Sequence, residues 1–134
     1  MAEALTCTVV TPEQTALETK ADFVALPLFD GEIGIAANHS PLIGRLGYGE
    51  MRIKSGSQTQ VYYIDGGFVQ VADNVVAVLT NRAVPAGKLD AVAAETQLRA
   101  ALDRTANTPE LQEVRARQIA QARAQMRTAR RARL

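Results

Sequence analysis

The residues that could carry catalysis or bind a metal in this chain are few and far apart. Cys7 is the only cysteine and His39 is the only histidine among 134 residues. A single cysteine forms neither an internal disulfide nor a cysteine-based zinc site, and a catalytic cysteine or histidine needs an oriented partner that the neighbouring sequence does not supply. Cys7 alternates with Leu5 and Val9, so we expect a buried strand thiol. His39 is interpreted as a surface-loop histidine or as an interface histidine.

The acidic residues and the glycines of the first part of the chain give no catalytic pattern either. Most of the acids fall at the ends of apolar runs, and no two are spaced as an acid–base pair. The glycines of 31–34 and 44–49 lack the Gly-Lys-Ser/Thr of a phosphate loop and do not open a helix, so we assign them to turns and bulges. The sequence therefore predicts no catalytic residue and no metal site.

Arginine is the one charged residue type that is concentrated in one part of the sequence, near the C-terminus. Residues 1–87 hold five basic and nine acidic side chains, for a net charge of −4, whereas residues 88–134 hold ten and five, for a net charge of +5. From Arg115 to the C-terminus there are seven arginines and no acid. Such a tail is a solvated helix face, a nucleic-acid patch or a helix that binds an acidic protein. It has no aromatic side chain for base stacking, so we favour the protein-binding helix and expect no nucleic acid.

The elements that position these residues differ between the two parts of the chain. Residues 1–87 alternate with a period of two in short runs, such as 5–9, and turn signals such as Asp30-Gly31 and Asp73-Asn74 separate the runs. Many short strands at this spacing are typical of a β-sandwich or a barrel. The composition is that of a globular protein, and no apolar run is long enough to span a bilayer. The start of the chain also lacks the pattern of a signal peptide.

Residues 88–134 change to helical periodicity and to good helix formers. Asp90 is placed to cap a first helix, and Thr108-Pro109-Glu110 is a start signal for a second. We predict two domains, a β domain at 1–87 and an antiparallel helical hairpin at 88–134 with its seam at 105–108, which makes the fold class α+β. Large apolar side chains are few in the hairpin, so we expect it to be marginally stable and to have more than one docking arrangement.

One block of the sequence resembles a known protein family. Residues 31–42 read Gly-Glu-Ile-Gly-Ile-Ala-Ala-Asn-His-Ser-Pro-Leu, close to the pattern G-x-[LI]-G-[IV]-x-x-x-H-[AS]-P-[LIM] of the epsilon subunits of bacterial and chloroplast F-type ATP synthases. The runs at 9–12, 66–71 and 74–79 resemble the first and last strands of that family in the same order. The block departs at Ala36-Ala37, where relatives often carry Leu-Pro.

The resemblance implies a β-sandwich of about ten strands followed by the two-helix hairpin. It implies a non-catalytic subunit of the central stalk, bound to the gamma subunit and to the c-subunit ring, which reaches the membrane only through the complex. The family's loop at this position meets the polar loops of the ring. The expected ring-facing residues are Glu32, Asn38, His39, Ser40, Pro41 and Leu42.

The resemblance also implies a regulatory role for the hairpin. In the family the hairpin lies on the sandwich or extends along gamma, and the extended form inhibits ATP hydrolysis by contacting the alpha/beta catalytic head. The expected contacts are Arg115, Arg117, Arg123, Arg127, Arg130 and Arg131. Some members bind ATP at a motif close to [IL]-D-x-x-R-A. Here Asp90 is present but Ala93 stands at the arginine position, which argues against strong ATP binding, and no other cofactor is expected.

The expected location is the cytoplasmic face of a bacterial inner membrane as a peripheral protein, with the chloroplast thylakoid membrane as the alternative. A free-standing module that binds protein or nucleic acid through the basic C-terminal helix is the alternative function.

Overall fold

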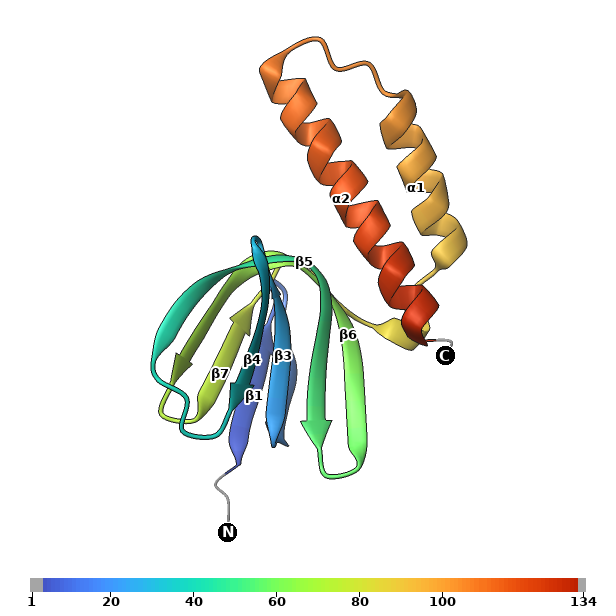
Figure 1. The fold of residues 1–134 in the computed structure, drawn as a ribbon. Coiled ribbons are helices and arrows are strands. Elements are labelled where there is room, and N and C mark those ends of the chain that lie inside the picture. Colours follow the sequence, from blue (N-terminus) through green and yellow to red (C-terminus); the bar gives the residue numbers. More distant parts are fainter. Residues whose placement is uncertain (1–3, 133–134) are drawn as a thin grey trace.

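The chain folds into eight strands followed by two helices. The computed structural model describes residues 4–132, with the side chain of residue 132 left out. The strands are β1 (Leu5–Val10), β2 (Thr15–Ala21), β3 (Phe23–Leu28), β4 (Gly31–Ala36), β5 (Leu42–Ser55), β6 (Gln58–Ala72), β7 (Val75–Leu79) and β8 (Ala83–Pro85). A short 3-10 helix, η1 (Ala86–Lys88), leads to α1 (Ala91–Asp103) and α2 (Pro109–Ala132). The predicted order of a β part and a helical hairpin is confirmed (Figure 1).

All eight strands belong to one sheet that folds over on itself into two layers. The hydrogen-bonded order is β2-β1-β7-β6-β5-β3-β4, and β8 pairs with β6. The two long strands serve both layers. The first part of β5 pairs with the last part of β6, from Leu42 with Val71 to Leu46 with Gly67, and the second part of β5 pairs with the first part of β6. Eight strands, with β5 and β6 counted in each layer, correspond to the ten that we expected.

Glycines allow the two long strands to bend between the layers. Gly66 and Gly67 have φ values of 71° and 106° in the middle of β6, a region that L-residues with side chains rarely adopt. A Cβ atom at Gly67 would collide with the backbone carbonyl of Leu79. On β5, a Cβ atom at Gly47 would lie 2.7 Å from the carbonyl oxygen of Leu28. The bends therefore depend on residues without side chains at these positions.

The core lies between the two layers. It is built from inward-facing apolar side chains of both layers, among them Leu5, Val24, Ile35, Met51 and Ile64, all fully buried. Cys7 is fully buried in the same cluster, as predicted from its alternation, and burial raises the pKa of its thiol to about 12.

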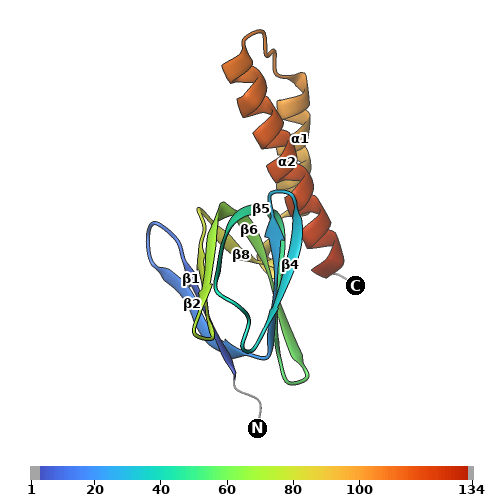
Figure 2. The same cartoon turned by 60° about the vertical axis from the view of Figure 1, so that its left-hand side comes forward.

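The hairpin projects from one end of the sandwich and touches it over only part of its length (Figures 1 and 2). Asp90 caps α1, as expected, because its carboxylate accepts hydrogen bonds from the backbone N–H groups of Val92 and Ala93, both at 3.0 Å. Thr108 Oγ1 accepts from Leu111 N at the start of α2. Of the two helices, α2 makes the main contacts with the sandwich, to β5, β6 and η1. None of the helices within residues 4–132 is long and apolar enough to cross a membrane.

The bend of β6 gives a prediction about stability. We expect Gly67→Ala to lower the free energy of unfolding of the sandwich by about 2–5 kcal/mol, because it adds both backbone strain and a clash. The matched control is Gly87→Ala, where an added Cβ meets no atom within 4 Å. Urea unfolding followed by the fluorescence of the three tyrosines, all in the sandwich, measures both changes. Equal stability of the two variants would show that the bend does not require glycine.

Candidate functional site

The outer face of one layer exposes an unusual number of apolar side chains. Ile43 is 76% exposed, Phe68 58% and Leu79 48%, on the neighbouring strands β5, β6 and β7. Phe68 pairs with Leu79 on one side and with Arg45 on the other, so these side chains share one face of the sheet. A groove of about 650 Å³ runs beside them, lined also by Val10 and Pro12. We call Ile43, Phe68, Val75 and Leu79 the apolar face.

An aromatic and a basic side chain extend the apolar face at one end. The guanidinium of Arg45 lies 5.4 Å from the ring centre of Phe29, a cation–π contact, and Phe29 is itself 64% exposed. Sequence reasoning missed this surface, although a signal existed: Val75 to Leu79 is apolar throughout, so β7 has apolar side chains on both faces.

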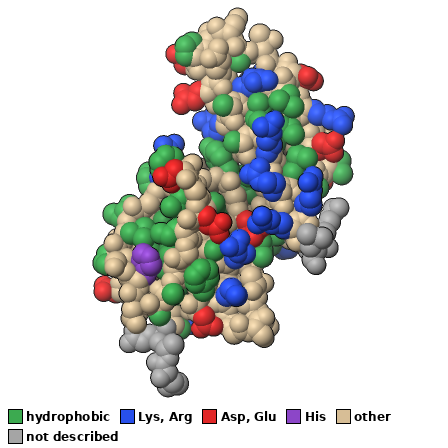
Figure 3. All heavy atoms as spheres, in the orientation of Figure 1, with side chains coloured by type: hydrophobic (Ala, Val, Ile, Leu, Met, Phe, Trp, Pro, Cys, Tyr) green, Lys and Arg blue, Asp and Glu red, His purple; other side chains and the backbone are tan. Residues whose placement is uncertain are grey.

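The loop that ends where β5 begins at Leu42, which we call the loop of 38–42, continues the apolar face at its other end. Asn38 has a φ of 65°, and its backbone N–H donates to Asn74 Oδ1 at 2.6 Å, which ties the loop to the β6–β7 turn. His39 Nδ1 lies 2.7 Å from the carbonyl oxygen of Ser40. Ser40 and Pro41 are exposed and Leu42 is half-buried, immediately before Ile43. In Figure 3 the histidine lies beside hydrophobic side chains of the sandwich.

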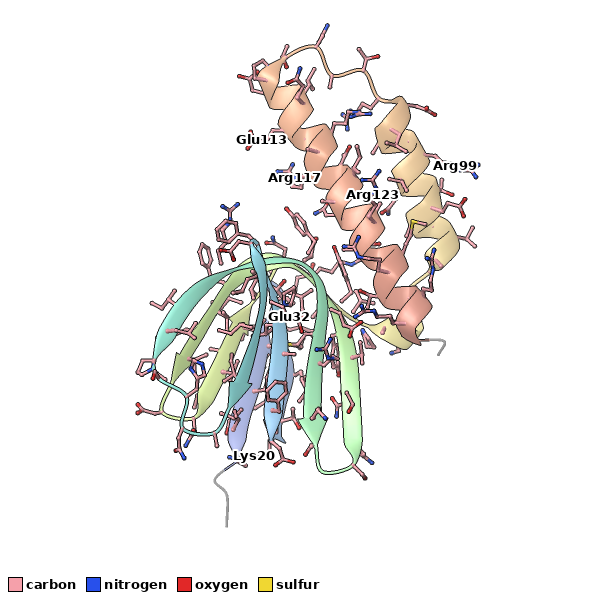
Figure 4. The ribbon with its side chains drawn as sticks, in the orientation of Figure 1. Lys20, Glu32, Arg99, Glu113, Arg117 and Arg123 are labelled. Carbon is pink, nitrogen blue, oxygen red and sulfur yellow. The ribbon has the colours of Figure 1, made fainter. Side chains whose placement is uncertain are left out.

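Glu32 lies apart from this loop. It stands near the start of β4, whereas the loop follows the end of that strand. At about 3.3 Å per residue, the six steps from residue 32 to residue 38 span roughly 20 Å. The structure therefore brings together five of the six residues predicted to face the ring and places the sixth at the other end of the strand. Figure 4 shows Glu32 at the end of the sandwich where α2 docks.

Glu32 belongs instead to a chain of four charges that ends on α2. Arg52 Nη2 donates to Glu32 Oε1 at 2.8 Å, and Arg52 Nη1 donates to Glu50 Oε1 at 3.1 Å. Arg131 Nη1 on α2 lies 3.7 Å from Glu50 Oε2. The hydrogen bond that Arg52 donates to Glu50, followed by smaller contributions of Glu32, raises the pKa of the Arg52 guanidinium. We call Glu32, Arg52, Glu50 and Arg131 the charge chain.

A second polar contact joins α2 to the other long strand. Tyr63 donates its hydroxyl to Asp65 Oδ1 at 2.8 Å, and Gln121 Nε2 of α2 donates to the same oxygen at 3.0 Å. Burial, with a contribution from the Asp65 carboxylate, raises the pKa of Tyr63 well above its ordinary value. The apolar part of the docked surface of α2 consists of small side chains, such as the buried Ala124.

The six predicted arginines of α2 differ in their contacts within the chain. Arg115 is half-buried, and its Nη2 donates to the backbone carbonyl of Leu102 at 3.0 Å, which ties the two helices together. Arg131 takes part in the charge chain. The remaining four are exposed along α2: Arg117, Arg123, Arg127 and Arg130. Figure 4 shows Arg117 and Arg123 leaving α2 on different sides, and Figure 3 shows basic side chains along the helices.

Asp90, the aspartate of the possible nucleotide motif, caps a helix in this chain. Both backbone N–H groups that approach Asp90 use the same oxygen, Oδ1, so the side chain has a structural role as a helix cap. Ala93 is exposed and offers no cation for a phosphate. Within the described range 4–132, no three His, Cys, Asp or Glu side chains are grouped so that they could hold a metal ion.

Comparison with known proteins identifies the family. Residues 4–86 match the family described as the beta-sandwich domain of the ATP synthase delta/epsilon chain. The ATP synthase epsilon chain of Rhodopirellula baltica is 48% identical over 127 residues, which cover 95% of this chain and 99% of the relative. The epsilon chain of Rubrobacter xylanophilus is 36% identical over 106 residues, 79% of this chain and 73% of the relative.

Two solved structures share the fold. A chain in the cryo-EM structure of the Euglena gracilis mitochondrial ATP synthase, with its OSCP, F1 and c-ring, aligns with a TM-score of 0.81 at 21% identity, covering 90% of this chain and 78% of that one. A chain of the Tetrahymena thermophila mitochondrial central stalk and c-ring aligns with a TM-score of 0.68 at 14% identity, covering 96% and 98%. These two likenesses show the fold. The family match and the sequence relatives show that this chain belongs to the family of ATP synthase epsilon chains, the non-catalytic subunits of that membrane-associated complex.

Proposed function

We propose that this epsilon chain works in the central stalk, where it links rotation of the c-subunit ring to the catalytic head together with gamma, and that its C-terminal helices inhibit ATP hydrolysis. The observation that carries the proposal is the apolar face, with a partly docked basic hairpin at the end of the same sandwich. An exposed apolar surface of this kind marks a protein interface.

The apolar face is the surface that we assign to gamma. It offers a large aromatic anchor, Phe68, beside a groove lined by Leu79 and Val10, with Arg45 at its rim. Protein interfaces combine such central apolar anchors with a polar or charged rim. Because the loop of 38–42 leads directly into Ile43, the geometry favours a contact of this loop with the edge of gamma where gamma meets the ring.

Glu32 then becomes the candidate for the ring contact itself. It lies at the opposite end of β4 from the loop, and its side chain is 56% exposed and negatively charged. A cationic side chain in the polar loops of the ring would pair with it. Asn38 to Leu42 stay candidates for the ring contact only if the ring reaches the other end of the sandwich.

The four exposed arginines of α2 support the inhibitory role. Arg117, Arg123, Arg127 and Arg130 are exposed and would meet an acidic surface of a catalytic beta subunit when the hairpin extends. We place the complex at the cytoplasmic face of a bacterial inner membrane, in keeping with relatives from Rhodopirellula baltica and Rubrobacter xylanophilus, with the thylakoid membrane as the alternative.

The gamma surface is tested with a charge placed in its centre. We expect Phe68→Glu to weaken binding to the cognate gamma subunit by about 30-fold or more, because the change removes an aromatic anchor and buries a carboxylate. Gln60→Glu adds the same charge to an exposed position on the other part of β6 and should leave the affinity unchanged. Isothermal titration calorimetry measures both. If Phe68→Glu bound gamma with wild-type affinity, gamma would not bind the apolar face, and the main support for the proposed function would be lost.

The ring contact is tested by disulfide formation. Glu32→Cys and, in a separate variant, Ser40→Cys are each paired with a cysteine in the polar loop of the c subunit in assembled complexes. We expect a cross-link from position 32 and none from position 40, since roughly 20 Å separate the two ends of β4. The reverse result would return the ring contact to the loop of 38–42.

Inhibition is tested by shortening and neutralising the hairpin. A chain that ends after Arg104 should bind gamma as the full chain does but should no longer inhibit the ATPase activity of the catalytic complex. A full-length chain with glutamine at positions 117, 123, 127 and 130 should lose most of the inhibition. Arg99→Gln on α1 is the control. Inhibition that survives the truncation would place it in the sandwich.

A further inference from the structure

The end of the sandwich beneath α2 holds a carboxylate in an unusual state. The side chain of Glu50 is only 12% exposed, and its Oε2 atom is buried and accepts no hydrogen bond from any residue that the structure describes. Arg131 of α2 lies 3.7 Å from this oxygen. A buried carboxylate oxygen with a single loosely placed cation beside it is sensitive to any change of charge nearby.

The surroundings of Glu50 are small and are shared between the sandwich and α2. A cavity of about 130 Å³ is lined by Gly31, Gly49 and Pro27 from the sandwich and by Ala124, Thr128 and Arg127 from the helix. The small residues allow α2 to approach the strands closely. Because alanine and threonine bury little apolar area, the charges at this contact have a large share in deciding whether the helix stays docked.

The charge chain connects this contact to the surface. Arg52 is held by Glu50 on one side and by Glu32 on the other, at 3.1 Å and 2.8 Å. Of the two carboxylates in the charge chain, Glu32 is the more accessible, at 56% exposure of its side chain. While Glu32 holds Arg52, the two carboxylates balance Arg52 and leave a negative charge to attract the basic end of α2.

We propose that the charge chain is a relay through which a cation that binds Glu32 releases the C-terminal half of α2 from the sandwich. The proposal rests on the proposed function, in which a cationic side chain of the ring meets Glu32. When a partner's arginine or lysine neutralises Glu32, the positive charge of Arg52 is no longer balanced. Arg52 then competes with Arg131 for Glu50 and repels both Arg131 and Arg127. Contact with the ring would thereby favour the free hairpin.

The relay can be measured in the isolated full-length chain. Thr128 is 2% exposed at the docked surface, so the labelling rate of a cysteine in a Thr128→Cys chain reports how often α2 undocks. The native Cys7 serves as an internal standard, because it is fully buried and its labelling requires the sandwich itself to open. The ratio of the two labelling rates separates undocking of the helix from loss of stability.

Substitutions in the charge chain are expected to change the labelling rate at position 128 in different directions. Glu32→Gln should raise labelling at position 128 by about 2- to 5-fold, the effect of one exposed ion pair, and Glu50→Gln should raise it at least as much. Arg52→Gln should lower the labelling, because both carboxylates then attract Arg127 and Arg131. Arg52→Lys keeps the charge and should stay near the parent rate. Glu18→Gln removes an exposed charge from β2 and should have no effect.

The opposite sign for Arg52→Gln is the decisive result. A network that merely stabilises the fold would loosen with any substitution, and labelling at position 128 would then rise in Arg52→Gln as in the acid variants. That outcome, or no response to Glu32→Gln, overturns the relay. If Arg52→Gln destabilises the sandwich, labelling of Cys7 rises with it, and Arg52→Lys then decides between the two explanations. It keeps the charge on which the relay depends but loses the guanidinium that bonds both carboxylates, so only a structural network would loosen. Because no partner is present, these outcomes are independent of whether Glu32 meets the ring.

Discussion

The fold depends on two long strands that pass from one layer of the sandwich to the other. β5 and β6 pair along their whole length, and the strands on either side attach to different parts of them. This is possible only where the backbone bends, and the bends coincide with Gly47, Gly66 and Gly67, where a side chain would clash or strain the backbone. Within the sandwich, Glu32 lies near the start of β4 and His39 follows its end, so these two residues, close in sequence, lie at opposite ends of that strand.

The sandwich therefore presents two surfaces of different chemistry. The layer of β5, β6 and β7 carries the apolar face, whose side chains are largely exposed in the isolated chain, as is typical of a protein interface. The opposite layer, at the end of β3, β4 and β5, carries the charge chain and receives α2 through small and polar side chains. The first surface is suited to holding a partner tightly and the second to contacts that form and break, because exposed ion pairs contribute little and respond to their surroundings.

The sequence was informative wherever one local pattern decided the structure. Alternation predicted the buried Cys7, the Asp90 and Thr108 signals predicted both helix starts, and the block at 31–42 led to the family. It failed where distant residues meet. The charge chain joins positions 32, 50, 52 and 131, and no spacing in a linear sequence shows that β4, β5 and α2 converge there. Glu32 and His39 were grouped because of the family resemblance at 31–42, and the strand β4 places them at its two ends.

The structure shows how the few large apolar side chains of the hairpin affect its docking. Val92, Leu102 and Leu111, three of its large apolar residues, are exposed, so the hairpin gains even less from burial than the sequence suggests. The docked half of α2 instead relies on buried alanines, on Gln121 at Asp65 and on Arg131 at Glu50. Polar contacts of this kind lose little when water replaces the partner. A helix attached in this way can leave the sandwich without exposing a large apolar surface, so undocking need not destabilise either part. Undocking of α2 is reversible because the side chains at the contact are small and little apolar surface is exposed. The balance of charge around Glu50 decides whether the docked or the free helix is favoured.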